Sequence, residues 1–258
     1  MDYEAFKAEI FRLTEINLSY YKEKQMKRRI DSLIAKNGYQ LYGDYVKALK
    51  TNTVLFNEFI NYLTINVSEF YRNPDQWEVL KKDIFPLLLK KNKKLKIWSA
   101  ACSTGDEPYT LVMVLNSYIP LTDIKIIATD IDKEALRKAR AGLYSEKSLE
   151  KLPPEYLGKY FVKNAGAYTI KDEVKNRVEF MQHNMLKDAY PTECDLIVCR
   201  NVLIYFTEEA KNFIYNKFNS SLKMEGVLFV GSTEQIIMSA RYGLSSMKTF
   251  FYVKDKDI

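Results

Sequence analysis

Two acidic side chains follow the second of two apolar segments, at a distance from an earlier small-residue turn that suits the binding of a nucleoside. The first segment, Leu95–Ala100, leads into a run of small residues that ends at Glu107. The second segment, Ile124–Thr129, leads into Asp130 and Asp132. An acid about 20 to 25 residues beyond a small-residue turn is placed to bind the two hydroxyls of a ribose. The alternative is that Asp130 and Asp132 only cap the helix that follows them.

Polar side chains also follow two later apolar segments. After Val178–Met181, Asn184 stands among apolar residues. It could recognise the edge of an adenine, or it could merely cap a turn. After Leu196–Cys199, Arg200 precedes the aromatic Tyr205, which could line a binding site or belong to the core. The recurrence of such residues after four successive segments is harder to attribute to chance than any single occurrence.

The elements that must position these residues are predicted from the apolar segments themselves. Short apolar runs predict strands at Leu95–Ala100, Ile124–Thr129, Val178–Met181, Leu196–Cys199, Val227–Gly231 and Phe250–Val253. Helical patterns lie between them at Pro108–Tyr118, Lys133–Ala141 and Glu208–Leu222. Alternation of buried strands with helices predicts an α/β fold, in which a parallel sheet is covered on both faces. Ligands of such a sheet bind beyond the carboxyl ends of the strands, where the acids and amides stand.

The first third of the chain has a helical pattern instead. Apolar residues recur at helical spacing from Phe6, from Met26 and from Leu55, and Asn73-Pro74 opens a further helix. Between the second and third strands, an insertion at about residues 142–177 contains a predicted antiparallel hairpin with its turn at residues 164–166. We therefore expect a small all-helical domain over residues 1–70 and a sheet domain over residues 71–258.

The chain offers few residues for metal or imidazole chemistry. It has one histidine, His183, and three cysteines that form no C-x-x-C pair, so no metal site is expected. A Ser-His-Asp or Cys-His mechanism is excluded unless His183 itself serves. No apolar run approaches the roughly 20 residues of a membrane helix. Acid also stands where a signal peptide would be basic, so the expected compartment is the cytoplasm.

A basic segment between Tyr20 and Lys36 predicts an acidic partner. Its basic residues are Lys22, Lys24, Lys27, Arg28, Arg29 and Lys36, against the two acids Glu23 and Asp31. If Met26 and Ile30 face the core, Lys24 and Arg28 lie on the opposite stripe of the helix. An ordinary solvated face is the alternative. Nucleic acid is not the expected partner, because no aromatic-interleaved platform or RNA-binding motif accompanies the segment.

Several long strings make the sequence similar to a known family, the CheR chemotaxis receptor methyltransferases. The strings are residues 66–72 (NVSEFYR), 96–109 (KIWSAACSTGDEPY), 128–132 (ATDID) and 199–206 (CRNVLIYF). The resemblance covers essentially the whole chain and is strongest to Gram-positive, Bacillus-type members. One departure is Asp106, where many members have glutamate. The resemblance implies a Rossmann-like class I methyltransferase sheet behind an all-helical N-terminal domain, with a short antiparallel insertion.

The resemblance also implies roles for individual residues. It implies contacts with S-adenosylmethionine, or with its product S-adenosylhomocysteine, from Asn66, Ser68, Arg72, Glu107, Asp130, Asn184, Met185, Arg200 and Asn201. It places Arg72 and Tyr205 nearest to the transferred methyl group, as the catalytic residues. For the basic segment it favours a docking surface for acidic receptor helices, formed by Lys24, Lys27, Arg28 and Arg29.

The reaction implied by the resemblance is methyl-ester formation on glutamate side chains of methyl-accepting chemotaxis receptors, which serves chemotactic adaptation. Glutamate has a reference pKa near ~4.3, so this nucleophile is already ionised at neutral pH and needs no general base. A working enzyme with one histidine is consistent with that reaction. The expected partners are the cytoplasmic helices of the receptors. We expect no nucleic-acid partner, no insertion into the membrane, and a monomer.

Overall fold

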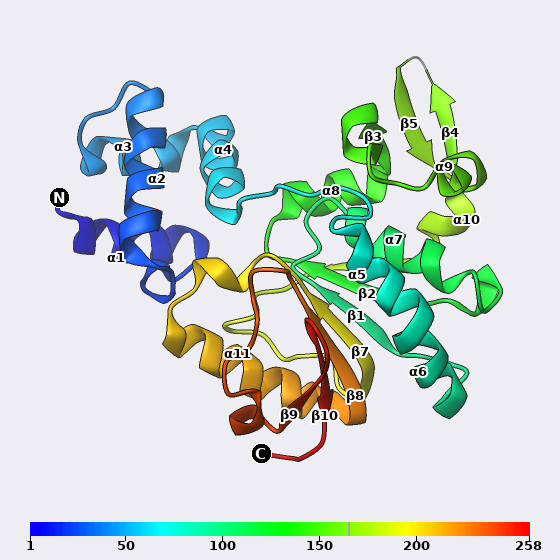
Figure 1. The fold of residues 1–258 in the computed structure, drawn as a ribbon. Helices are drawn as coiled ribbons and strands as arrows, with labels where there is room; N and C mark the ends of the chain where they lie inside the picture. Colours follow the sequence, from blue (N-terminus) through cyan, green and yellow to red (C-terminus); the bar gives the residue numbers. More distant parts are fainter. Residues whose placement is uncertain (165) are drawn as a thin grey trace. The chain divides into compact units, whose positions relative to one another are not determined.

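The computed structural model describes residues 1–164 and 166–258, which form two compact units. The first unit comprises Met1–Asn66 and Leu203–Phe213, and the second comprises Val67–Val202 and Ile214–Ile258. The N-terminal part of the first unit is helical (Figure 1). Its elements are α1 (Tyr3–Thr14), a 3-10 turn (Leu18–Tyr20), α2 (Glu23–Lys36), α3 (Tyr42–Thr51) and α4 (Thr53–Thr64).

The helices of the first unit bury the apolar residues that recur at helical spacing. Phe6 of α1, Ile30 of α2 and Phe59 of α4 are completely buried. The rings of Phe6 and Phe59 meet edge to face with centroids 6.3 Å apart, which is a favourable aromatic geometry. The side chain of Asp2 caps α1 and that of Asn52 caps α4. The predicted helical character of this region is confirmed.

The segment Leu203–Phe213 is tied to the beginning of α2. The N–H of Lys22 donates to the carbonyl of Tyr205 at 2.9 Å, and the N–H of Thr207 donates to the carbonyl of Tyr20 at 2.8 Å. The rings of Tyr21 and Phe206 pack with centroids 4.8 Å apart. The backbone around Tyr205 is therefore held by the helical unit.

The second unit is built on a mixed sheet. Within the described residues the sheet has seven strands in the order β6-β2-β1-β7-β8-β10-β9 (Figure 1). The strands are β1 (Ile97–Ala100), β2 (Ile126–Asp130), β6 (Val178–Gln182), β7 (Cys194–Cys199), β8 (Leu222–Val230), β9 (Leu244–Lys248) and β10 (Phe251–Lys254). The first five in this order are parallel, and β10 and β9 are antiparallel to their neighbours.

Helices cover both faces of the sheet. They are α5 (Pro74–Val79), continued by a π-helical turn (Leu80–Ile84) and α6 (Phe85–Lys91), with α7 (Asp106–Leu115), α8 (Lys133–Ala141) and α11 (Glu208–Ser221). Trp77 of α5 and Val112 of α7 share one buried cluster with Ile97 and Phe229 of the strands. On the other face, the Trp98 ring packs edge to face on Phe218 of α11 at 5.6 Å. The predicted α/β fold with two covered faces is confirmed.

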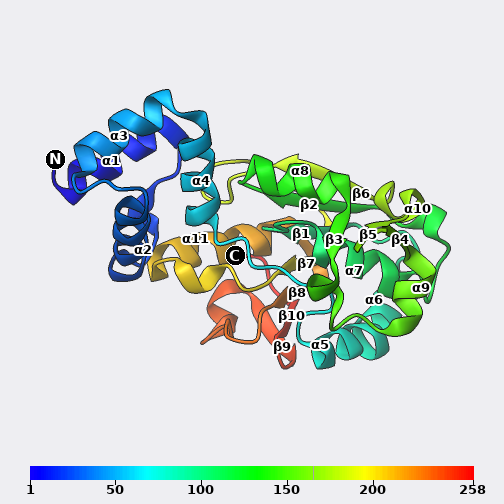
Figure 2. The ribbon, with the colours of Figure 1, turned by 90° about the horizontal axis from the view of Figure 1, so that it is seen from above.

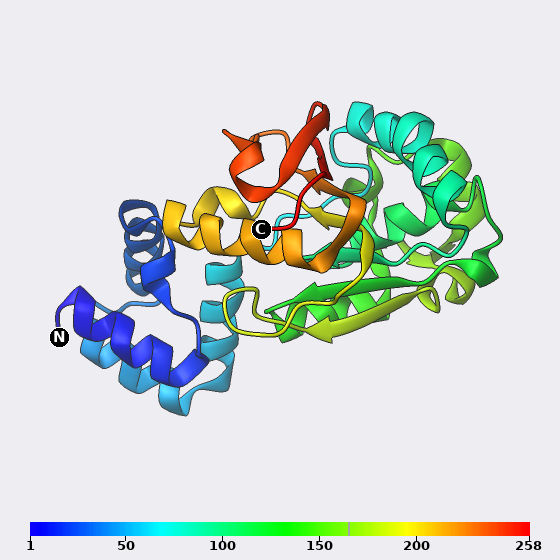
Figure 3. The same cartoon turned by 90° about the horizontal axis from the view of Figure 1, so that it is seen from below.

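The end of the chain differs from the expectation of one closing strand. The structure adds β9, and β8 begins five residues before the predicted Val227, at Leu222. Figure 3 shows β9, β10 and the turn before them beside α11, in orange to red. Tyr242 of this turn packs on Tyr215 of α11 with ring centroids 5.0 Å apart. The polar stretch at the start of β8 and the weak alternation in β9 explain why these strands were not expected.

The insertion after α8 forms a small antiparallel sheet. Its strands are β3 (Leu143–Ser145), β4 (Phe161–Asn164) and β5 (Ala167–Ile170), in the order β3-β5-β4. Helices α9 (Pro154–Tyr160) and α10 (Asp172–Lys175) lie beside it (Figure 2). The hairpin predicted here is confirmed in its two strands. The middle residue of its predicted turn, Ala165, lies outside the described residues.

The three cysteines are part of the core of the second unit. Cys102, Cys194 and Cys199 are all free and buried. Burial raises the pKa of each thiol, for Cys194 to about 12. Each therefore remains protonated at neutral pH, which is the expected state of a small core residue.

Candidate active site

The loop after β1 folds back so that a backbone amide points at the end of β2. Ala101 and Ser103 adopt left-handed conformations, with φ of 57° and 49°. Such a conformation costs roughly 1–3 kcal/mol at a residue other than glycine. It lets the N–H of Ser103 donate to Oδ2 of Asp130 at 2.7 Å. Gly105 follows with φ of 90°, and a Cβ there would lie only 2.9 Å from Ala139.

The two acids at the end of β2 have different contacts. Asp132 caps α8, because its carboxylate accepts the N–H groups of Glu134 and Ala135 at 2.8 and 3.2 Å. Asp130 instead accepts the N–H groups of Ser103 and Asp132, the latter at 2.9 Å. Asp130 is 6% exposed, and burial raises its pKa to about 6. The capping alternative therefore applies to Asp132, and Asp130 remains the candidate ribose ligand.

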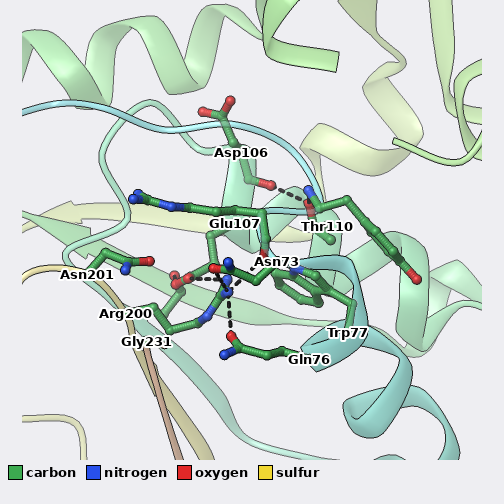
Figure 4. Close-up of polar contacts among 12 residues, drawn as sticks. Asn73, Gln76, Trp77, Asp106, Glu107, Thr110, Arg200, Asn201 and Gly231 are labelled. Carbon is green, nitrogen blue, oxygen red and sulfur yellow. Dashed lines mark hydrogen bonds and ion pairs between the residues drawn. The ribbon is translucent and has the colours of Figure 1, made fainter. Parts of the chain in front are cut away.

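A buried ion pair joins the ends of β1 and β7 (Figure 4). Glu107, in the first turn of α7, has Oε2 3.5 Å from Nη1 of Arg200. The hydroxyl of Ser99 donates to Oε1 of Glu107 at 2.9 Å. Burial raises the pKa of Glu107, and the charge of Arg200 only partly opposes this. A buried carboxylate is stabilised by further positive charge, so Glu107 suits a cationic group of a ligand.

Most of the guanidinium of Arg200 is engaged with protein groups. Its Nη2 donates to the carbonyl of Arg72 at 2.7 Å and to Oε1 of Gln76 at 2.8 Å. Its plane lies over the rings of Trp77 and Phe229, 5.2 and 4.7 Å from their centroids. Its buried Nε has no hydrogen-bond partner among the described residues. Arg200 therefore links β7 to α5 and fixes the backbone of Arg72 (Figure 4).

The segment before α5 is held by a second buried acid. Asp106, 1% exposed, accepts the hydroxyl of Thr104 at 2.6 Å. Burial raises the pKa of Asp106, and hydrogen bonds from Thr104 and Ser68 partly offset this. The half-buried side chain of Arg72 donates to the carbonyl of Val67 at 3.2 Å. Asp106, where the sequence departs from many family members, thus positions the predicted cofactor residue Ser68.

The turn after β6 places Asn184 and Met185 at the same edge of the sheet. Oδ1 of Asn184 accepts the N–H of Leu186 at 2.9 Å, so its carbonyl is used as a turn cap. An amide NH₂ has two donors besides this acceptor, and they could still serve an adenine edge. Met185 is buried, and its carbonyl accepts the hydroxyl of Tyr190 at 2.7 Å. The structure is therefore compatible with Asn184 both as a turn cap and as a residue that contacts the edge of an adenine.

The remaining predicted site residues Asn66 and Tyr205 belong to the first unit. Asn66 donates to Oγ1 of Thr64 at 3.0 Å and to Oδ1 of Asn61 at 3.3 Å. Tyr205 lies in a 3-10 turn, half-buried, and its carbonyl accepts the N–H of Lys22. Their roles toward the cofactor and the substrate stay predictions.

The four residues of α2 predicted to form a docking surface divide into two pairs. Lys24 and Arg28 are exposed, and with Lys27 they line an open depression of about 540 Å³ on this helix. Lys27 is half-buried and lies 3.7 Å from Asp31. Arg29 turns inward: it donates to the carbonyl of Tyr62 at 2.7 Å, with its plane 4.6 Å from the centre of that ring. Lys24 and Arg28 are thus the pair best placed to meet a partner.

One residue of the strand-end region was missed by the sequence analysis. Glu234 follows β8, is 5% exposed, and accepts the N–H groups of Asn201 and Val202 at 2.5 and 2.8 Å. The rule that polar residues directly after a parallel strand serve the site had been applied to four strands. Applied to the fifth strand, it would have pointed to the stretch 231–234 (GSTE).

The chemical groups of the strand-end residues are complementary to those of S-adenosylmethionine. The buried carboxylate of Asp130 and the largely buried carboxylate of Glu107 both have raised pKa values, which indicates that their charge is incompletely compensated within the protein. The cofactor supplies a sulfonium, an ammonium and ribose hydroxyls, which are cationic or donor groups. Within residues 1–164 and 166–258, we find no cluster of three or more His, Cys, Asp or Glu side chains able to hold a metal. In the same residues, no helix has the length and apolar character that a membrane crossing requires.

Comparison with known proteins also indicates a site for S-adenosylmethionine. Residues 66–251 match the family model described as "CheR methyltransferase, SAM binding domain", and residues 1–64 match "CheR methyltransferase, all-alpha domain". The "Chemotaxis protein methyltransferase" of Listeria monocytogenes is 43% identical over 98% of this chain and 97% of its own length. The protein of the same name from Escherichia coli is 32% identical over 95% of this chain and 88% of its own length.

These matches extend over both units and include the strings around Glu107, Asp130 and Arg200. A family model that spans the sheet unit, a near full-length relative and a strand-end cluster suited to the cofactor agree with one another. The chain therefore belongs to the CheR methyltransferase family and is a methyltransferase that uses S-adenosylmethionine.

Proposed function

We propose that this enzyme transfers the methyl group to glutamate side chains on the cytoplasmic helices of methyl-accepting chemotaxis receptors, forming methyl esters. The observation that carries the proposal is an acid-lined site whose strand ends offer carboxylates and amides but no accessible imidazole. The names of the relatives, chemotaxis protein methyltransferases, support a receptor as the substrate. The proposal places the enzyme in the cytoplasm, where the substrate helices would lie.

The one histidine is badly placed to act as a general base. His183 is 9% exposed, and its ring packs edge to face against Trp98 and Tyr190. Its Nε2 lies 3.1 Å from the carbonyl of Ala189. A glutamate nucleophile is ionised at neutral pH and needs no base, whereas an ammonium group of lysine would have to lose a proton first. A carboxylate acceptor therefore suits this site best.

The charge balance of the reaction suggests separate roles for Arg72 and Tyr205. The bound cofactor supplies an electrophilic methyl group on a cationic sulfur. Because a cation and an anion give neutral products, a tight ion pair to the attacking carboxylate would stabilise the ground state more than the transition state. We propose that Arg72 orients the cofactor or the substrate, and that the neutral hydroxyl of Tyr205 contacts the reacting glutamate.

The positive charge of helix α2 supports the proposal that the substrate is an acidic helix. Its exposed residues Lys24 and Arg28 are four residues apart, on one face. The same helix begins at the residue after Lys22, whose N–H is bonded to the carbonyl of Tyr205. The proposed docking face and the proposed catalytic tyrosine are thus joined within one compact unit. Residues 1–70 and 71–258 are retained as the proposed domain bounds.

The chemistry of the product tests the proposal. Protein, labelled S-adenosylmethionine and receptor-containing membranes should give a product whose label is released as methanol by mild base, because a carboxyl ester hydrolyses under those conditions. A methylated lysine, arginine or nucleobase would keep its label. A base-stable label would overturn the glutamate assignment while leaving a methyltransferase.

A variant at Tyr205 tests the assigned role. Tyr205→Phe should lower turnover more than affinity for S-adenosylhomocysteine, since its hydroxyl is assigned to the substrate side. Tyr118→Phe is the matched control, because the hydroxyl of Tyr118 bonds to the carbonyl of Lys81 within the second unit. Equal turnover in both variants would remove Tyr205 from the catalytic residues.

A further inference from the structure

The carboxylate of Glu234 binds three backbone amides from two segments. Its Oε2 accepts the N–H of Asn201 at 2.5 Å and that of Gly231 at 2.9 Å. Its Oε1 accepts the N–H of Val202 at 2.8 Å. The N–H of Glu234 itself donates to the carbonyl of Gly231 at 3.0 Å, which closes the turn after β8. A buried carboxylate with several amide donors is a strong, directional anchor.

The anchored residues need such support. Asn201 has φ of 61°, a left-handed conformation that asparagine adopts more readily than most residues but that is less favourable than the right-handed helical or extended conformations. Without the carboxylate, the neighbouring N–H groups of Asn201 and Val202 would lose their acceptor in a partly buried place. Glu234 therefore compensates a locally strained turn directly after β7.

Close packing around this contact leaves no room for a side chain at position 231. A Cβ on Gly231 would lie 2.5 Å from Oε2 of Glu234, 2.7 Å from the backbone N of Asn201 and 2.9 Å from its Nδ2. In Figure 4, Gly231 and Asn201 both lie beside Arg200. The φ of Gly231 is not in the left-handed region, so backbone conformation does not explain the glycine. The close contact with Glu234 and Asn201 explains it instead.

The strand order indicates which part of the cofactor lies at this turn. Asn184 follows β6 and Asp130 is the last residue of β2, so the nucleoside half is expected at that side of the sheet. Glu107 follows β1 and Asn201 follows β7, the next strands in the order. The amino-acid half of the cofactor would then lie at β1 and β7, beside the turn that Glu234 anchors.

We propose that Glu234 is a positioning residue that holds the Asn201–Val202 turn in the shape that binds the amino-acid half of the cofactor. It acts through the backbone of Asn201 and does not itself touch the reacting atoms. This inference rests on the cofactor arrangement used for the proposed function, but it does not depend on which group of the substrate is methylated.

The test is a pair of variants at the two ends of β7. In Glu234→Gln one oxygen becomes an NH₂ group, which faces an N–H donor and cannot accept it. The control is Asp195→Asn at the other end of β7, where Asp195 accepts the N–H of Lys96 at 2.7 Å and pairs with Lys223 at 2.9 Å. Both variants lose a buried carboxylate, so their stabilities should fall alike and only their ligand affinities should differ.

Calorimetry with two probes separates positioning from general damage. Glu234→Gln should bind S-adenosylhomocysteine about tenfold more weakly, the equivalent of one lost charge-assisted hydrogen bond. It should bind 5′-methylthioadenosine, which lacks the amino-acid part, within about twofold of the wild type. Asp195→Asn should bind both probes within about twofold of the wild type.

A second pair of variants changes no charge. Gly231→Ala should push Glu234 from Asn201 and repeat the selective loss of S-adenosylhomocysteine. Gly226→Ala is its control, because a Cβ there would lie 2.9 Å from the carbonyl of Cys194, at the opposite end of β7. Unchanged affinity in folded Glu234→Gln and Gly231→Ala, or an equal loss for both probes, would overturn the inference. A base-stable product would overturn the proposed function alone.

Discussion

The enzyme keeps charge in two regions of opposite character. At the strand ends of the second unit, Asp130 and Arg200 are buried and the side chain of Glu107 is 14% exposed, and each is bonded to specific protein groups. On α2 of the first unit, Lys24 and Arg28 are exposed on a solvated helix face. Removing one buried charge leaves its partner without compensation, whereas removing one exposed charge leaves only water in its place. We therefore expect each buried charge to have a large individual effect when it is removed. The exposed charges of α2 are expected to act mainly through their combined positive charge.

The largest effect is expected at Arg200. Arg200→Met removes the cation that pairs with Glu107 and the donor that holds the carbonyl of Arg72. Breaking a buried pair costs about 3–5 kcal/mol, so the free energy of unfolding in urea should fall by that amount. The control is Arg140→Met, since Arg140 is exposed and donates to the carbonyl of Phe180. Equal losses in the two variants would show that burial does not distinguish them.

The next effect separates the two neighbouring acids after β2. Asp130→Ala should weaken the binding of S-adenosylhomocysteine roughly ten- to hundredfold, because it removes the carboxylate proposed to accept the ribose hydroxyls. Asp132→Ala removes a helix cap and should lower stability by about 1 kcal/mol with little change in affinity. Calorimetry and thermal unfolding measure both quantities. If Asp132→Ala lost more affinity than Asp130→Ala, the assignment of the two acids would have to be reversed.

The raised pKa of Asp130 predicts a pH dependence that the exposed lysines cannot produce. With a pKa of about 6, the carboxyl is ionised at pH 7.5 and about nine-tenths protonated at pH 5. If the ionised form binds the ribose, affinity for S-adenosylhomocysteine should fall roughly tenfold over that range. If the affinity of the wild type does not change with pH, or if the affinity of Asp130→Asn falls by the same factor, this carboxyl is not the titrating group.

The free protein should respond with the opposite sign. A carboxyl whose pKa rises from 3.8 to about 6 on folding contributes stability that is fully present below pH 3.8 and is lost as the pH rises through about 6. The contribution of Asp130 to the free energy of unfolding should therefore grow on acidification while the cofactor affinity declines. Denaturant unfolding of wild type and Asp130→Asn between pH 7 and 5 measures this difference.

The smallest effect is expected on α2, and salt should reveal it. Reversing Lys24 and Arg28 to Glu should slow receptor methylation roughly three- to tenfold at low ionic strength, and added salt should narrow the gap. The matched control reverses Lys47 and Lys50, which are exposed on α3 of the same unit. Cofactor affinity should be unchanged in both variants. Normal methylation by the α2 variant at low salt would leave this helix as an ordinary solvated face.

The sequence predicts elements well where local signals coincide. Helix α8 was expected at Lys133–Ala141, and it has these bounds because Asp132 caps its start and Gly142 takes the left-handed conformation at its end. The position of Asp130 followed from the strand before it. In contrast, helical spacing placed Arg28 on the stripe opposite the core but did not predict the inward turn of Arg29, which depends on Tyr62, a residue distant in sequence.

The same reasoning explains which site contacts could not be predicted. Glu234 stands 33 residues from Asn201, and its partners are backbone amides. Because nearly every residue type has a backbone amide, the sequence does not indicate which ones Glu234 contacts. The engagement of Arg200 with Gln76 and with the carbonyl of Arg72 is equally non-local. The residue types and their strand-end positions were readable from the sequence. The division between ligand contact and support required the three-dimensional arrangement.

The burial of every cysteine has a practical consequence for following the enzyme at work. Thiol reagents react with the thiolate, and the raised pKa values of Cys102, Cys194 and Cys199 keep these thiols protonated and enclosed. A cysteine introduced at Ala35, exposed on α2, should therefore be labelled by a fluorescent maleimide well before the native three. The wild-type sequence thus gives a low background for site-specific dyes, and a dye at this position would test whether a receptor helix binds at α2.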